Sequence, residues 1–277
     1  MHTLTLKDEG GPELVAIGSG SFSMGAAAGE ELNRFGVPDR YYGRELPQRR
    51  IRITQPFAVA KVPVTLREFG RFVDQSGHQP AHWCEVWQGE EAIFDKSLSW
   101  RNPGFTQDDD HPVVAISWKD AKAYLRWLSA GTGRTYRLLT DAEFEYAARG
   151  GSDAIWFWGD SEDVQHLYAN TQKNTSWRFT SPVGSFMPNA FGLYDILGNV
   201  WEWVEDSFKE GSKTEQQAPV LMPDSELKVI RGGGWNSRMF DIRCSARQRD
   251  YEWHNDQDIG FRVARNLDPA EAARLTN

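Results

Sequence analysis

Cysteine is scarce in this chain of 277 residues, which contains only Cys84 and Cys244. Two cysteines form at most one bridge, so the chain is not a disulfide scaffold in which several bridges replace a hydrophobic core. The scarcity also leaves the redox compartment open, because so few cysteines are compatible with either an oxidising or a reducing environment.

Long apolar segments are also missing. No stretch approaches the roughly 18 consecutive apolar residues of a membrane-spanning helix, so we expect no membrane span. Residues Met1–Asp8 lack the apolar core of a signal peptide. The sequence as it stands therefore favours a cytoplasmic protein, or a periplasmic or secreted one if a leader has been removed.

Positive charge is in deficit. The formal net charge is −8 at neutral pH, from 31 Lys and Arg against 39 Asp and Glu. A protein that binds nucleic acid without sequence preference needs a positive field over its surface. We therefore expect no nucleic-acid partner.

Tryptophan and glycine are abundant instead, with 12 and 25 copies. This mixture is typical of an irregular, loop-rich fold in which aromatic rings fill the gaps between tight turns. The length allows one large domain or two small ones. Because there is no internal repeat and no linker, we predict a single domain over residues 1–277, with a core at about 14–265 and a tail at 266–277.

Three segments combine a capping residue with apolar residues at helical spacing. The predicted helices are Leu66–Gln75 after Thr65, Trp118–Ala130 after Ser117, and Asp141–Arg149 after Thr140. Short apolar or alternating segments predict strands elsewhere, among them Glu13–Met24, Gln48–Val59 and Lys228–Arg231. The tail is expected to form a short helix over Pro269–Leu275.

The stretch around which the chain is organised is Phe191–Trp203, which places aromatic rings and two carboxylates around a Gly-Asn turn. Gly198 and Asn199 accept positive φ angles more easily than other residues. Asp195 and Glu202 flank the turn, and carboxylates with exposed carbonyls are ligands that calcium prefers. The pattern fits a calcium site, and it also fits a buried β-bulge with two satisfied acids.

Five motifs follow one another along the chain: Ile17–Gly25, Pro112–Trp118, Arg137–Gly151, Gly192–Trp203, and Arg231–Trp235 with Ile259–Arg262. Together they resemble the motifs of the formylglycine-generating-enzyme superfamily, also called sulfatase-modifying factors. The resemblance extends from about Leu14 to Arg265. It implies an α+β, C-type-lectin-like fold with two main helices, short antiparallel sheets and much irregular loop.

The resemblance also implies calcium as a structural cofactor. By position, the ligands of one family site are the side chains of Asp195 and Glu202 and the carbonyls of Gly198 and Val200. A second family site implies Asn170 and the carbonyl of Thr171, together with an acid in residues 174–177. No acid is present there, so the second site is incomplete in this sequence.

The chain departs from the family at the redox centre. Formylglycine-generating enzymes carry a cysteine pair just after the Arg-Gly-Gly-x-Trp motif, and soft thiolates suit its copper(I) ion. Here no cysteine follows Trp235 until Cys244, which we interpret as a small buried hydrophobe. The resemblance is therefore to a divergent member that is not a sulfatase activator. The identity of any other redox metal stays open, with His78, His82, Cys84 and His254 as candidate ligands.

Two functions remain, and whether the chain is an enzyme stays open between them. The first is an oxidative or metal-dependent tailoring enzyme for a peptide or natural product, since other superfamily branches also lack the cysteine pair. Its pocket would lie between Trp235 and Trp253. The catalytic candidates are Trp235, Arg247 and His254, with His254 as the acid–base group.

The second function is a non-catalytic binding module, as in the retroelement variable proteins that share the fold. Its ligand surface would comprise Asn236, Arg238, Phe240, Tyr251 and Trp253. Tyr, Trp and Asn suit adaptable recognition. The expected partner is a peptide, a protein, a glycan or a small natural product.

Arg231, Arg247 and Arg262 belong to the predicted closing strands. We expect them to bind backbone carbonyls and core acids such as Glu143 or Glu145. The alternative is an arginine fork that holds a substrate carboxylate.

Overall fold

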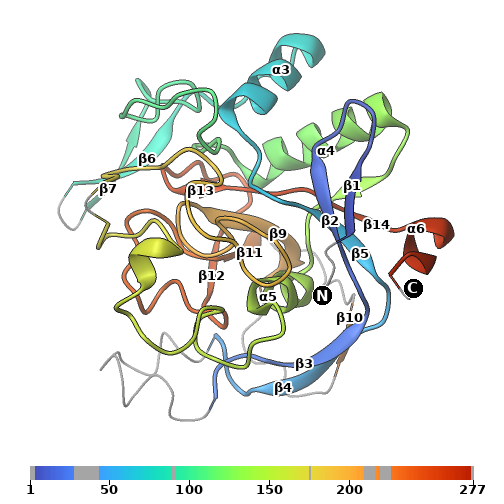
Figure 1. Cartoon of the computed structure of the whole chain (residues 1–277). Coiled ribbons are helices and arrows are strands. Elements are labelled where there is room, and N and C mark those ends of the chain that lie inside the picture. The colour runs from blue at the N-terminus through green and yellow to red at the C-terminus, as the bar shows by residue number, and fades with distance from the viewer. Residues whose placement is uncertain are drawn as a thin grey trace.

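The computed structural model describes residues 4–27, 44–88, 91–174, 176–208, 216–218 and 226–275. Within these residues the chain forms four small sheets and four α-helices, joined by long irregular segments (Figure 1). This α+β architecture confirms the predicted fold class. No helix among the described residues is long and apolar enough to cross a membrane.

A five-stranded antiparallel sheet joins the two ends of the described chain. Its order is β1 (Leu4–Lys7), β2 (Glu13–Ile17), β5 (Phe57–Ala60), β14 (Ala264–Asn266) and β8 (Tyr136–Arg137). All four residues of β5 are buried, as are four of five in β2. A strand that is covered on both faces buries all its side chains, so its residues are apolar without alternation, as in the sequences ELVAI and FAVA.

Arg265, on β14, ties the first and last described elements together. Its guanidinium donates to both carboxylate oxygens of Asp8 at 2.8 and 2.9 Å, and to those of Glu271 at 2.7 and 2.8 Å. Glu271 lies on helix α6 (Pro269–Ala273), at the position predicted for the short tail helix. The tail is therefore held by ion pairs to the five-stranded sheet.

The sheet that carries the organising stretch has the order β12 (Arg247–Tyr251), β11 (Leu227–Arg231), β9 (Trp201–Ser207) and β13 (Ile259–Gly260). β11 is antiparallel to both of its neighbours, whereas β13 runs parallel to β9. Six of the seven residues of β9 are buried. The end of the Phe191–Trp203 stretch thus lies in the core.

Two smaller sheets complete the described structure. β3 (Gly20–Met24) pairs antiparallel with β4 (Arg49–Ile53), and β10 (Gln216–Ala218) adds to β4 in parallel. β6 (Cys84–Gln88) and β7 (Glu91–Asp95) form a separate hairpin, at the upper left of Figure 1. The parallel pairings of β10 and β13 depart from the expected antiparallel sheets, because both strands are reached through long connections that need not reverse the chain.

The three longer helices begin and end where local signals place them. α3 (Leu66–Ser76), α4 (Trp118–Thr132) and α5 (Asp141–Arg149) each start with a complete capping box and end at a left-handed glycine. Their boundaries agree with the sequence prediction to within two residues. The two longest helices, α3 and α4, are the main helices of the described fold, and α5 is a third, shorter one.

Residues 150–200, between α5 and β9, contain one short 3₁₀ helix, η1 (Gln165–Leu167), as their only helix or strand in the described part. This segment still buries large side chains, including Trp156, which is fully inaccessible. Buried aromatic rings thus hold an irregular segment in place, as the tryptophan and glycine content predicts.

Candidate functional site

The segment predicted to form the pocket starts at the end of β11, where Gly232–Gly234 turns the chain. Gly233 has a φ angle of 79°, and a Cβ atom there would lie 2.5 Å from a methyl carbon of Ile242. No other residue fits this turn. Trp235 follows at once, and its backbone N–H donates to the carbonyl of Asn199 at 2.9 Å. The turn thereby fixes Trp235 beside the organising stretch.

Trp235 forms an aromatic wall with two rings from distant loops. Phe105 and Phe179 stack at 4.4 Å between centroids with an angle of 4°, and Trp235 lies edge-on to them at 5.8 and 4.9 Å. The indole nitrogen of Trp235 contacts the carbonyl of Gln257 at 3.4 Å. Three elements that are remote in sequence therefore meet beside residues 257 and 258.

Asp258 is the acid at this wall, and sequence reasoning missed it. Its side chain lies against Gly234, where a Cβ atom would be 3.0 Å from the carboxylate oxygen Oδ2. Burial, opposed by a hydrogen bond from the exposed Asn236, raises the pKa of Asp258 to about 6. The neighbouring Asp256 has a pKa raised in the same direction, by burial and by Asp258. The site thus holds a buried carboxyl group that titrates close to neutral pH.

His254 lies in a separate cluster, under the β6–β7 hairpin. Its Nε2 contacts a carboxylate oxygen of Glu85, and its Nδ1 lies 2.8 Å from a carboxylate oxygen of Asp250. Burial favours the neutral imidazole, but the two carboxylates outweigh it and raise the pKa of His254. Because a carboxylate oxygen lies close to each ring nitrogen, the geometry favours a charged structural imidazolium over a metal ligand or a free base.

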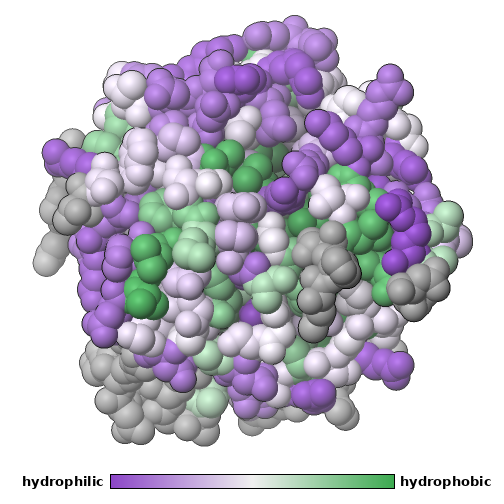
Figure 2. All heavy atoms as spheres, viewed as in Figure 1, coloured by the Kyte–Doolittle hydropathy of each residue, from purple (hydrophilic) through white to green (hydrophobic). Residues whose placement is uncertain are grey.

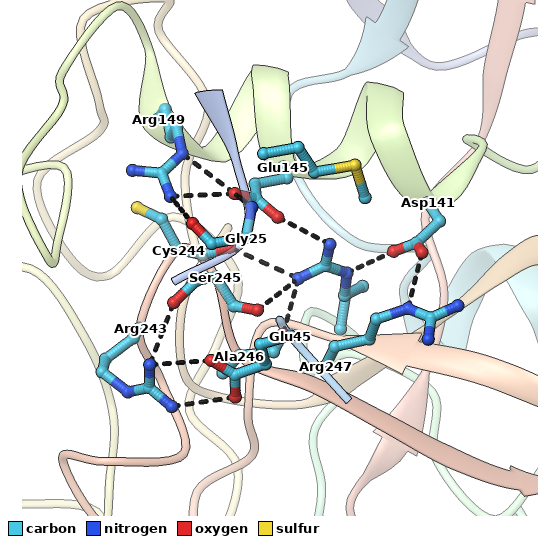
Figure 3. A network of polar contacts seen from close by, with 12 residues as sticks. Gly25, Glu45, Asp141, Glu145, Arg149, Arg243, Cys244, Ser245, Ala246 and Arg247 are labelled. Atoms are coloured by element: carbon cyan, nitrogen blue, oxygen red, sulfur yellow. Dashed lines mark hydrogen bonds and ion pairs between the residues drawn. The ribbon is translucent and has the colours of Figure 1, made fainter. Parts of the chain in front are cut away.

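Arg247 lies in a buried ion-pair network, not beside His254. Its Nε donates to Asp141 at 2.6 Å, and its guanidinium stacks over Phe208 at 4.6 Å. Arg231, also bonded to Asp141, donates as well to Glu145 and to the carbonyls of residues 244–246. Figure 3 shows this network with Arg149 and Arg243 at its edge. Arg231 thus has the structural role expected for it, while a catalytic role for Arg247 stays a prediction.

The predicted ligand surface is only partly accessible. Asn236, Arg238, Tyr251 and Trp253 are exposed, and Tyr251 and Trp253 keep 44% and 42% of their area in contact with solvent. Phe240 is 4% exposed, so its assignment to the surface is wrong. The guanidinium of Arg243 lies 4.7 Å from its ring centroid and covers it.

Asp195 fits the calcium prediction. It adopts a positive φ of 50°, and its Oδ2 accepts from the backbone N–H of Gly184 at 2.6 Å. Its Oδ1 is buried without a hydrogen-bond partner, and burial raises the pKa of the carboxyl group to about 6. A buried oxygen with no donor is a group that a cation would satisfy.

Glu202 fits calcium less well, because Arg262 already binds it. The guanidinium of Arg262 donates to both Glu202 oxygens, and each side chain is 1% exposed. Of the two alternatives for this stretch, Glu202 matches the satisfied buried acid and Asp195 does not. A cation at Asp195 would have to share Glu202 with Arg262.

The second predicted metal site also contains an unpartnered oxygen. Asn170 is fully buried, its Nδ2 donates to the carbonyl of Phe179 at 2.8 Å, and its Oδ1 has no partner. Thr171 is buried beside it. Across the described residues, no three or more His, Cys, Asp and Glu side chains gather as metal ligands. Any cation here would depend on backbone carbonyls.

The candidate redox ligands are not brought together. His78 pairs with Asp120 at 2.6 Å, and His82 is exposed. Cys84 and Cys244 are both buried and are not bonded in a disulfide, and burial together with Asp256 and Asp258 raises the pKa of the Cys84 thiol. The donor set therefore does not fit the two-thiolate copper centre of the family.

Comparison with known proteins identifies the family. The family model for the sulfatase-modifying factor enzyme 1-like domain matches residues 3–267. The formylglycine-generating enzyme of Streptomyces coelicolor is 31% identical, over 92% of this chain and 89% of its own.

Two further similarities extend this result. The serine/threonine-protein kinase pkn1 of Chlamydia pneumoniae is also 31% identical, but the chain spans only 38% of that protein's length. The solved structure of PvdO from Pseudomonas aeruginosa is 31% identical, covers 95% of this chain and 98% of its own, and superposes with a TM-score of 0.78. With the family match over residues 3–267, these similarities show that the chain belongs to the sulfatase-modifying factor enzyme 1-like (formylglycine-generating-enzyme-like) family.

Proposed function

We propose that this protein is a tailoring enzyme for a peptide or natural product that uses the family fold without the family's thiolate–copper chemistry. The observation that carries the proposal is the buried carboxyl group of Asp258, which lies beside the Gly-Gly-Gly-Trp turn after which the cysteine pair of the family would follow. In this proposal, Asp258 supplies a proton-transfer group beside the turn after which the metal-binding pair of the family would follow.

The surroundings of Asp258 support this role. A carboxyl group with a pKa of about 6 gives up and takes back a proton near neutral pH, as a general acid or base must. The exposed Asn236 connects it to the surface by a hydrogen bond. The rings of Phe105, Phe179 and Trp235 offer apolar contacts for a planar or aliphatic group of the substrate.

The reaction class that we propose is the oxidative or metal-dependent tailoring inferred from the sequence. Of this chemistry, we assign to the described residues only the transfer of a proton by Asp258. We assign no redox metal, because the histidines and cysteines considered for one lie apart. Calcium is proposed in a structural role at Asp195, and at Asn170, where buried oxygens lack donors.

The test is turnover of a mixed peptide library, followed by mass spectrometry. We expect modified peptides with the unaltered protein, loss of about 10²-fold or more in rate with Asp258→Asn, and little change with Asp241→Asn. Asp241 is a suitable control because it lies in the segment between Trp235 and Asp258, and burial also raises its pKa. A cysteine peptide from a sulfatase should not be converted to formylglycine. Conversion of that peptide, or full activity of Asp258→Asn, would contradict the proposal.

A second candidate is the non-catalytic binding module. The exposed rings of Tyr251 and Trp253 favour it, since exposed aromatic side chains mark recognition surfaces. Absence of turnover under every condition, together with saturable peptide binding, would favour this function over the first.

A further inference from the structure

Four aromatic rings form a continuous row on the surface beside the β6–β7 hairpin. In order they are Phe94, Trp83, Trp253 and Tyr251, with centroid distances of 5.2, 6.1 and 5.3 Å between neighbours. We call this row the aromatic ridge. Phe94, Trp253 and Tyr251 keep 52, 42 and 44% of their area exposed, which is unusual for rings of this size. Tyr251 and Trp253 lie nearly parallel, at 22°.

The ridge is held in place from below. All four rings lie within 6.4 Å of the His254 imidazole, which is itself fixed by Glu85 and Asp250. The hairpin is joined to the body of the protein because the N–H of Glu85 donates to the carbonyl of Asn255 at 2.8 Å. The exposed rings are therefore preorganised, which lowers the entropic cost of binding.

The chain around the ridge is strongly acidic. The described residues 84–88 and 91–95 contain Glu85, Glu91 and Asp95, and residues 250–254 add Asp250 and Glu252, with no Lys or Arg among them. Local cations compensate only part of this charge: His254 pairs with Glu85 and Asp250, and Glu252 pairs with Lys119 at 2.9 Å and Lys228 at 3.8 Å. Arg249, the nearest arginine in sequence, stacks on Phe208. The rings thus lie in a negative field.

We infer that the aromatic ridge docks a cationic peptide segment, with arginine side chains stacked on the exposed rings. A guanidinium is planar, stacks on aromatic faces and is weakly hydrated, so it suits a row of rings inside an acidic surround better than a neutral group does. Charge complementarity selects this occupant. The inference goes beyond the proposed function, because docking does not depend on any chemistry at Asp258.

A second exposed hydrophobic patch serves as the control for binding at the aromatic ridge. Leu167, Trp177 and Met187 are also exposed, and with Lys173 they line a pocket of about 790 Å³. Figure 2 shows hydrophobic surface at the position of η1, to which Leu167 belongs. This second patch contains Trp177, 36% exposed, but lacks the acidic surround of the ridge. Trp177 is therefore the matched counterpart of Trp253.

The experiment is fluorescence anisotropy with a labelled Gly/Ser peptide that contains two arginines, and with its twin in which both arginines are citrulline. Citrulline keeps the shape of arginine and loses the charge. We expect the arginine peptide to bind at least about tenfold more tightly, and Trp253→Ala and Phe94→Ala each to weaken it by about fivefold or more. Trp177→Ala should leave binding unchanged.

Each other outcome overturns the inference. Equal binding of the citrulline peptide would mean that the ridge does not recognise the positive charge of arginine, and would point to an apolar or glycan-like ligand. Binding that falls with salt but ignores both Trp253→Ala and Phe94→Ala would be non-specific attraction to an acidic protein. Self-association that Trp253→Ala abolishes, measured by sedimentation, would assign the ridge to a second copy of the chain. The peptide pair also gives a result if one variant fails to fold, because it uses the unaltered protein.

Discussion

The guanidinium of Arg262 and the carboxylate of Glu202 form a buried pair with contacts of 2.7 to 3.0 Å. Further N–H groups of Arg262 donate to the carbonyls of Ala60, Tyr194 and Asp195. The pair thereby connects β5, β9 and the organising stretch. The pair also lowers the negative charge that the predicted calcium site can offer, because the Arg262 guanidinium neutralises the Glu202 carboxylate.

Removal of one partner should be costly. We expect Arg262→Met to lower the free energy of unfolding by about 3–5 kcal/mol, since it leaves the Glu202 charge buried and unpaired. The double variant Arg262→Met/Glu202→Leu should recover part of this loss. Urea unfolding of the single and the double variant measures these changes. Lys173→Met is the control, because the ion pair of Lys173 with Glu162 is exposed and should contribute about 1 kcal/mol or less. A loss as small as that of the control would contradict the prediction.

Calcium should stabilise the protein through Asp195, and more so at higher pH. The pKa of Asp195 in the folded protein, about 6, lies above the value of 3.8 for an unperturbed aspartate. Without a cation, stability is therefore lost as pH rises from about 4 to 6, by up to about 3 kcal/mol. We expect added calcium to raise the melting temperature at about pH 7.5 and to do little below about pH 5.

Asp195→Asn provides the control for calcium. Without metal it should be more stable than the unaltered protein above about pH 6, because no charge is buried, and calcium should no longer raise its melting temperature. Magnesium, which demands a tighter octahedral site, should substitute poorly. An equal calcium effect in Asp195→Asn would place the ion elsewhere.

His254 should couple the β6–β7 hairpin to pH in the opposite sense. The groups that face it are the carboxylates of Glu85 and Asp250 and the four rings of the ridge. The pKa of His254 in the folded protein is raised above 6.5. The stabilisation of the folded state by the protonated ring is therefore complete below pH 6.5, and it is lost as pH rises through the folded pKa. His254→Gln should therefore cost about 1–2 kcal/mol in acid and less in alkali. Proton NMR titration of the ring and hydrogen exchange in β6 would check this, and a pKa below 6.5 would refute it.

Asp206 is a site where one substitution should stabilise the protein. Burial and the neighbouring Asp141 charge raise its pKa to about 7, whereas Arg231 and Arg247 bring the pKa of Asp141 to about 2 despite its burial. An acid with a raised pKa reduces stability as pH rises from about 4 to 7. Asp206→Asn should increase the free energy of unfolding by up to about 4 kcal/mol at about pH 8, because its side-chain oxygen can still accept from the N–H of Asp141. Unfolding measured across pH should show no gain in acid, and an equal gain at every pH would point to another cause.

Local rules predicted the helices because their signals are local. Thr65, Ser117 and Thr140 each accept a hydrogen bond from a residue three positions later, so the spacing in sequence is the spacing in space. Strand pairing has no such rule. β14 joins β5 across some 200 residues, and nothing in the three residues of β14 encodes that partner.

The site was harder to predict for the same reason. Asp258 follows a polar run that reads as a solvated loop, and it is buried only because Gly234 and Asn236 come from another part of the chain. Phe240 was misplaced because its cover, Arg243, is a polar residue that packs with its guanidinium face. Family motifs located the Asp195–Glu202 stretch but did not show which of its acids Arg262 neutralises.

The position of β14 between β5 and β8 has a consequence for biosynthesis. The five-stranded sheet stays open between these strands until residues 264–266 have left the ribosome, so a nascent chain with every helix up to α5 in place still exposes an unpaired strand edge. A chain interrupted before Arg265 would also leave Asp8 without its arginine. Such products should aggregate or be degraded instead of persisting as partly functional fragments.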